Sequence, residues 1–129
     1  MVLPERLARF NRHVTNRITG SVATRLPGFG VVVHRGRRSG RTFRTPVNVF
    51  RMGAGYVVAL TYGSDSDWVK NVLAAGGCEV ETRGRRVSLG RPRIVHDETR
   101  RRVPAAVRPI LRAIGVDDFL LLDVVAAAR

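Results

Sequence analysis

The chain of 129 residues has the length of one domain, which we expect to span residues 1–129, and its hydrophobic fraction of 44% is ordinary for a globular fold. A single cysteine excludes an internal disulfide framework, and a net charge of +13 predicts an anionic partner. No apolar run is long enough to span a bilayer, and the first residues lack the continuous apolar core of a signal peptide, so we expect a cytoplasmic protein.

Residues 1–26 have an amphipathic pattern. Apolar side chains recur at steps of three or four, which predicts a helix, and arginines lie off this stripe. The apolar stripe consists of Leu3, Leu7, Phe10, Val14, Ile18, Val22 and Leu26. Two interpretations stay open: packing of the stripe on the domain, which is the commoner use of such a pattern, and docking of a basic helix on an anionic membrane.

From residue 30 onward the pattern is typical of strands. Residues 31–33, 42–52 and 56–61 are rich in strand formers, and a glycine turn separates the last two runs. Residues 79–82 and 86–89 predict a hairpin, whose second strand is extended by 91–96.

Two helices are expected between and after these strands. Ser66 or Asp67 caps a predicted helix over about 68–75, which ends at two glycines. Asp97 is expected to cap a basic helix that reaches Ile114 and is offset at two prolines. Residues 119–125 suit either a strand or a helix, and we assign a strand. Because the strands come as hairpins, the order predicts an α+β fold with a mostly antiparallel barrel and flanking helices.

Residues 34–47, HRGRRSGRTFRTPV, place five arginines around a Gly-Ser turn between two strands. Backbone N–H groups of such a turn can bind an anion, and guanidinium groups add bidentate contacts to phosphate or carboxylate. A basic turn exposed to solvent explains the same composition, so the residues alone leave the two interpretations open.

Residues 61–71, TYGSDSDWVKN, form the second candidate. A Gly-Ser loop that leads into a capped helix presents free N–H groups at the helix start. Trp68 could pack on a flat ring, or it could be a core tryptophan with solvated neighbours. No metal site is expected, because the histidines are far apart and no cluster has ligand spacing. Cys78 is expected to be a buried, inert thiol.

Together, GRRSG with the following RTPV, YGSDSDWVKN and CEVETRGRRV resemble the deazaflavin-dependent nitroreductase family over about residues 26–125. The resemblance implies the split β-barrel fold of FMN-binding oxidoreductases and the coenzyme F420, which carries a phosphate and a polyglutamate tail. It further implies an oxidoreductase in which hydride passes from the reduced deazaflavin to a polarised small-molecule acceptor of enone, quinone or nitro type.

The resemblance also implies cofactor-binding residues. Those that bind the phosphate and tail are Arg37, Arg38, Ser39 and Gly40, with Arg44 one residue away from the family position and Pro46 at the start of the paired strand. Those beside the deazaflavin ring are Thr61, Tyr62, Gly63 and Ser64, followed by Trp68, Lys70 and Asn71. Ser64 and Tyr62 are candidate proton donors. Some members place tyrosines from the C-terminal part over the substrate, and this chain has none after residue 62.

Three alternatives remain at this point. FMN is the alternative cofactor on the same barrel. A non-catalytic basic module for nucleic acid or another ligand is the alternative class, although its basic segments lack interleaved aromatics, so we expect no nucleic-acid partner. A carrier of a lipophilic ligand is the third. The wider superfamily implies a homodimer.

Overall fold

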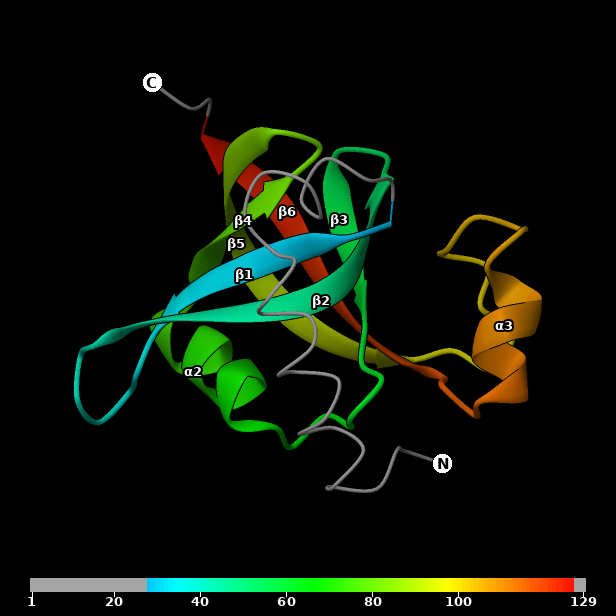
Figure 1. Cartoon of the computed structure of the whole chain (residues 1–129), viewed down its shortest axis with the longest axis horizontal. Helices are drawn as coiled ribbons and strands as arrows, with labels where there is room; N and C mark the ends of the chain where they lie inside the picture. The colour runs from blue at the N-terminus through cyan, green and yellow to red at the C-terminus, as the bar shows by residue number, and fades with distance from the viewer. Residues whose placement is uncertain (1–27, 127–129) are drawn as a thin grey trace.

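The computed structural model describes residues 28–126, within which six strands form a closed barrel (Figure 1). Neighbouring strands are antiparallel in the order β1, β2, β3, β6, β5, β4, and β4 pairs again with β1. The strands are β1 (Gly30–Arg35), β2 (Thr42–Met52), β3 (Gly55–Ala59), β4 (Gly77–Thr82), β5 (Arg85–His96) and β6 (Asp118–Ala126). The helices are α2 (Asp67–Ala75) and α3 (Arg108–Ala113). This confirms the expected α+β barrel; the helix expected in residues 1–26 lies outside the described residues.

Strands β3 and β6 bury side chains on both faces, which explains their continuous apolar sequences. Successive residues of a strand point to opposite faces. Val58 and Leu120 belong to the cluster inside the barrel, whereas Val57 and Phe119 belong to a second cluster outside it. The segment 103–116, which includes α3, covers this outer face with buried side chains of its own. Both faces of the two strands are therefore core.

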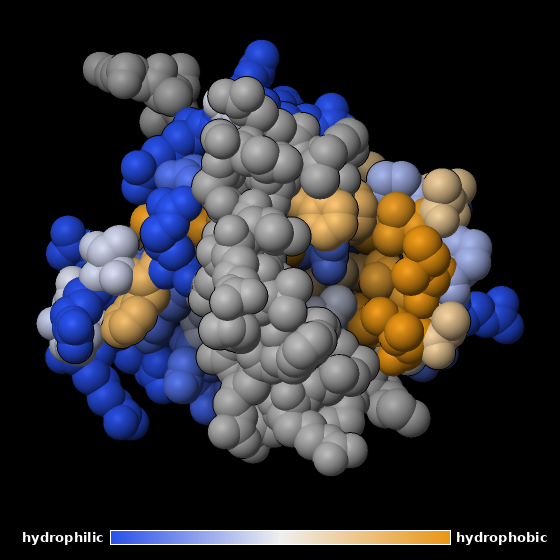
Figure 2. Space-filling view, in the orientation of Figure 1, coloured by the Kyte–Doolittle hydropathy of each residue, from blue (hydrophilic) through white to orange (hydrophobic). Residues whose placement is uncertain are grey.

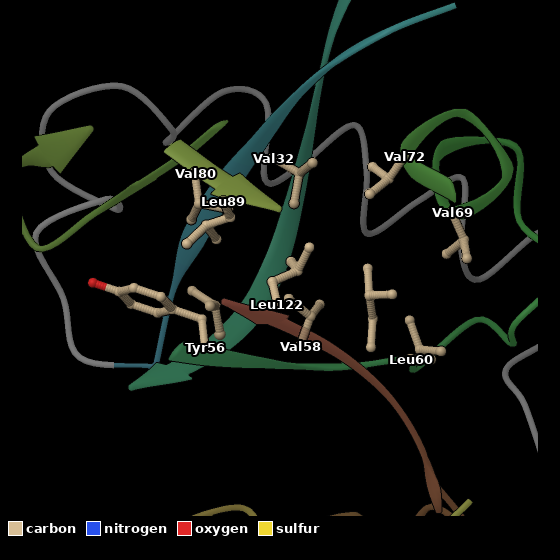
Figure 3. Close-up of a cluster of buried hydrophobic side chains, with 11 residues drawn as sticks. Val32, Tyr56, Val58, Leu60, Val69, Val72, Val80, Leu89 and Leu122 are labelled. Carbon is tan, nitrogen blue, oxygen red and sulfur yellow. The ribbon is translucent and has the colours of Figure 1, made fainter. Parts of the chain in front are cut away.

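Helix α2 contributes directly to the barrel interior. Val69 and Val72 are fully buried in the same cluster as Val32 of β1 and Leu60 after β3. Figure 3 shows both valines extending from the helix toward the strand side chains. Full burial of a side chain of this size stabilises the fold by roughly 1.5–3 kcal/mol. The helix is thus held in place by core packing, which fixes the polar residues on its other faces.

The turn between β4 and β5 has the two-residue loop that strand twist favours. Thr82 pairs with Arg85, which leaves Arg83 and Gly84 as the loop, with φ of 53° and 75°. Positive φ at both loop positions is the geometry of a type I′ turn, whose twist matches that of the strands. The predicted hairpin is confirmed, and the second strand continues through an irregularity between Gly90 and Arg93.

The prediction of a long helix from Asp97 to Ile114 is wrong. Asp97 Oδ1 accepts hydrogen bonds from the N–H and the hydroxyl of Thr99, which closes a turn instead of capping a helix. Arg100 adopts a left-handed φ of 56°, and only residues 108–113 are helical. Pro109 lies in the first turn of α3, where its missing N–H has no helical partner to lose.

The two sides of the molecule differ in polarity. Figure 2 shows apolar residues gathered over α3, where Ile110 is 61% exposed, and hydrophilic residues over the side of the β1–β2 loop. No helix among the described residues is long and apolar enough to cross a membrane.

Folding brings His96, the last residue of β5, close to three carboxylates next to it and at the start of β6. Its Nδ1 lies 2.8 Å from Asp118 and 3.6 Å from Asp117, and its Nε2 lies 3.1 Å from Glu98. Hydrogen bonds to Asp118 and then Glu98 raise the pKa of His96 to about 9. The imidazole is therefore charged near neutral pH, and the exposed group is an ion cluster that links the two strands.

The two adjacent glycines after α2 are needed for different reasons. One has a left-handed backbone conformation, and the other lies very close to the backbone of a neighbouring strand. Gly76 has a φ of 77° and open space around it, whereas a Cβ on Gly77 would lie 2.3 Å from the carbonyl oxygen of Leu89. We expect Gly76→Ala to lower the free energy of unfolding by about 1 kcal/mol. Gly77→Ala should lower it by about 3 kcal/mol, because β4 and β5 must separate. Urea unfolding of both variants measures this; equal losses would contradict the close approach.

The His96 cluster predicts a pH-dependent stability. The folded pKa of about 9 lies above the ordinary 6.5, so the stabilisation is complete below pH 6.5 and disappears as pH rises through 9. The unfolding temperature of the wild type should therefore fall relative to that of His96→Gln over this range. The effect should be small and weaker in high salt, because the group is exposed. Parallel pH curves for the two proteins would contradict the assignment.

Candidate functional site

The arginine-rich segment forms a tight loop between β1 and β2, as the sequence predicts. The Gly36 N–H donates to the Arg41 carbonyl oxygen, and the Gly40 N–H donates to the Gly36 carbonyl oxygen. Ser39 Oγ accepts a hydrogen bond of 3.2 Å from the Arg41 N–H. Gly40 has a φ of 72°, and a Cβ on Gly36 would lie 2.7 Å from Ser39 Oγ. Both glycines are therefore required by the loop geometry.

Arg37 and Arg38 have different environments in this loop. The backbone N–H and the guanidinium Nη1 of Arg37 both donate to Asn71 Oδ1 on α2, at 3.1 and 2.7 Å. Its Nη2 lies 3.4 Å from a carboxylate oxygen of Asp67. Arg38 is exposed and makes no hydrogen bond or ion pair with another described residue. Arg37 thus anchors the loop on α2, and Arg38 offers an uncompensated charge beside that anchor.

A buried histidine lies behind this anchor. His34 Nε2 is 2.9 Å from Thr45 Oγ1, and His34 Nδ1 is 3.2 Å from Asn71 Nδ2. Burial lowers the pKa of His34, and its ring stacks on Phe43 at 5.8 Å between centroids. The sequence motifs did not single out His34 or Thr45 as site residues. Strand alternation could have indicated that His34 is buried, because it lies two residues after the core residue Val32 and therefore on the same face of the strand.

A small open pocket lies beside Trp68, at the start of α2. Its lining residues are Pro46, Val47, Ala59, Leu60, Thr61, Tyr62, Gly63 and Trp68. Its empty volume of about 230 Å³ includes open solvent. The pocket is therefore a shallow, open depression that can contact a ring system from one side but does not enclose it.

The structure brings together four of the residues predicted around the ring, and it adds Pro46, which was predicted at the start of the paired strand. Those that line the pocket are Pro46, Thr61, Tyr62, Gly63 and Trp68. The Ser66 hydroxyl donates a hydrogen bond of 3.3 Å to the Gly63 carbonyl oxygen, which fixes this loop at the start of α2. Ser66 occupies the N-cap position as predicted, but its side chain makes no capping hydrogen bond to the helix. Ser64 is not part of the lining. Lys70 is exposed on α2, and its side chain makes no hydrogen bond or ion pair with another described residue.

Arg44 lies apart from the loop and has a carboxylate partner. Both terminal nitrogens of its guanidinium donate to Glu81 on β4. This hydrogen bonding lowers the pKa of Glu81 and raises that of Arg44. The charge of Arg44 is therefore compensated in the structure.

Cys78 is not a candidate nucleophile. Burial, and then the negative charge of Glu79, raise the pKa of its thiol to about 12. The thiolate is negligible near neutral pH, in agreement with the expected inert thiol.

One family of known proteins matches most of the chain. Residues 7–114 match the family F420H(2)-dependent quinone reductase, and no curated protein matches the chain. The match covers most of the sequence, including the arginine loop, the pocket residues and α2. It confirms the deazaflavin-dependent family indicated by the motifs, with F420 and not FMN as cofactor. This chain is therefore a member of the F420H2-dependent quinone reductase family, an oxidoreductase on an antiparallel β-barrel.

Proposed function

We propose that the protein reduces a quinone with F420H2, with the ring of the cofactor lying against the small open pocket and its anionic part on the arginine loop. The observation that carries this proposal is the position of α2 between the two sites. Trp68 of α2 lines the pocket, and Asp67 and Asn71 of the same helix hold the loop through Arg37. The same helix therefore sets the distance between the pocket and the arginine loop.

The loop residues fit an anionic group. Arg38 has no acidic partner among the described residues, so its charge is available to an anion. Arg37 is already fixed on α2, so its side chain needs little further ordering when an anion binds. Ser39 and Gly40 complete the proposed phosphate and tail contacts. Arg44 is the weaker candidate, because an anion would compete with Glu81 for its guanidinium.

The pocket residues fit a planar ring. Apolar surface from Val47, Leu60 and Trp68 lies beside the backbone of the Thr61–Gly63 loop, which offers polar groups for the ring edge. A bound, reduced deazaflavin supplies a hydride. The chain has to orient the ring and keep water from one of its faces.

Reduction of a quinone to a hydroquinone also requires a proton. Tyr62 lines the pocket and Ser64 does not, which favours the Tyr62 hydroxyl as the proton donor of the two. Lys70 and Asn71 do not line the pocket either. Among acceptors we favour a quinone over an enone or a nitro compound, because this is the substrate class of the matching family.

The charge of Arg38 provides the direct test of cofactor binding. A charge-assisted hydrogen bond contributes about 1.5–3 kcal/mol, so Arg38→Ala should weaken F420 binding at least about tenfold. The double variant Arg37→Ala with Arg38→Ala should abolish it, whereas Arg41→Ala should change it less than about twofold. Titration followed by Trp68 fluorescence, and the KM for F420H2 with a soluble quinone such as menadione, measure this.

Three outcomes would contradict parts of the proposal. Absence of saturable F420 binding by the wild type would remove the cofactor site. An equal loss in Arg38→Ala and Arg41→Ala would show general charge attraction and not a specific contact. Turnover of a nitro compound or an enone faster than of the quinone would overturn the acceptor.

We also infer that residues 1–26, which lie outside the described residues, touch an anionic membrane. Quinones with isoprenoid tails are dissolved in bilayers, and the predicted stripe in this segment combines apolar residues with arginines. The cytoplasmic location and the homodimer stay predictions, and sedimentation equilibrium decides the oligomeric state.

Vesicle flotation tests the membrane contact. The wild type should float with vesicles that contain phosphatidylglycerol. It should stay in the bottom fraction of the gradient when the vesicles contain phosphatidylcholine alone. Leu7→Asp with Phe10→Asp should abolish flotation, because the two charges interrupt the apolar stripe. Ile110→Asp, on the exposed face of α3, is the matched control and should float normally. Loss of flotation in the control alone would assign the contact to α3.

A further inference from the structure

A chain of polar side chains connects the barrel to the arginine loop. It runs from Thr45 on β2 through His34 on β1 and Asn71 on α2 to Arg37 in the loop. His34 and Asn71 are both 6% exposed. The three elements and the loop meet here and are joined by side-chain hydrogen bonds as well as by packing.

The direction of each hydrogen bond in the chain follows from the groups at its end. The N–H groups of Arg37 can only donate, so the oxygen of the Asn71 amide must face them. The amide nitrogen of Asn71 then points to His34 Nδ1, which must accept. The proton of a neutral His34 consequently sits on Nε2 and is donated to Thr45 Oγ1.

Burial agrees with this neutral form of His34. Desolvation lowers its pKa, so the imidazole is uncharged near neutral pH and its Nδ1 keeps a lone pair. A donor in place of Nδ1 would oppose the amide N–H of Asn71. The buried amide would then turn or lose its partner, and its oxygen would leave Arg37.

The loop has few other contacts that fix its place on α2. Its internal hydrogen bonds join Gly36, Ser39, Gly40 and Arg41 to one another, which sets its shape and not its position. Among the described residues, Arg37 donates the hydrogen bonds that join the loop to α2, at Asn71 and Asp67. The orientation of the Asn71 amide therefore decides where the loop lies.

We propose that His34 is a positioning residue of the cofactor site: by accepting a hydrogen bond from Asn71, it holds the arginine loop in the position that receives the anionic part of F420. This inference rests on the proposed function for its ligand, but the loop order that it describes is a property of the free protein. Asn71 then acts on the cofactor through Arg37.

The competing explanation is that His34 only fills space, because its ring stacks on Phe43. Two substitutions separate the explanations. His34→Phe keeps an aromatic ring on Phe43 and removes the acceptor. His34→Asn removes the ring and keeps an amide oxygen close to the place of Nδ1. Hydrogen bonding predicts that the phenylalanine variant is the worse of the two, and packing predicts the reverse order.

The first measurement is amide hydrogen exchange of the free, full-length proteins. In His34→Phe the Arg37 amide, whose acceptor is Asn71, should exchange at least about tenfold faster than in the wild type, with β3 and β6 unchanged. In His34→Asn the increase should stay below about threefold. Equal rates in the two variants, or the reverse order, would overturn the proposal.

The second measurement is turnover of F420H2 with menadione. His34→Phe should raise the KM for F420H2 about tenfold and leave kcat nearly unchanged, and His34→Asn should resemble the wild type. A wild type that does not bind F420 would defeat the proposed function, while the exchange rates would still decide the role of His34. A higher KM without faster exchange at Arg37 would overturn the positioning role.

A third measurement uses the wild type alone and stays valid if His34→Phe does not fold. The ¹⁵N shifts of the His34 ring report which nitrogen carries the proton. A neutral ring protonated at Nε2 supports the chain of hydrogen bonds. A proton on Nδ1, or a charged ring at neutral pH, would overturn it.

Discussion

The amide of Asn71 is the contact on which the site depends, because it joins the helix, the barrel and the arginine loop. Its oxygen receives two hydrogen bonds from Arg37, and its nitrogen faces His34. Leaving such a buried group unpaired costs about 1–3 kcal/mol, which is a large part of the stability of a small domain. The loop is consequently restricted to positions that satisfy this amide.

Core packing places that amide. Val69 and Val72 hold α2 against the barrel interior, and this leaves Asn71 toward β1 and Trp68 toward the pocket. Substitutions in the core under α2 would therefore move both parts of the site together. The polar contacts refine a position that burial of apolar surface has already set.

Some of the many arginines form ion pairs with acidic residues, and others do not. Several outward-facing arginines of the barrel are compensated, as in the pairs Arg44–Glu81 and Arg86–Glu79. Arg38 and Arg41 of the loop have no such partner among the described residues. The net charge of +13 attracts anions in general, but uncompensated charge on an anchored loop distinguishes one place where a compact anion can be held.

The sequence by itself determined the strands, the short helix before residue 76 and the arginine turn, because alternation, capping and glycine punctuation are local signals. It also identified the family through the loop and Trp68 motifs. It failed at residues 97–107, where the Asp97 side chain closes a turn instead of capping a helix, since local patterns do not say which of the two hydrogen bonds is made.

Only the tertiary structure decided that Arg44 is paired with Glu81, that Ser64 lies outside the pocket lining, and that His34 meets Asn71 across 37 positions. Those contacts depend on strand register and helix packing, which join residues far apart in the chain and leave no local pattern.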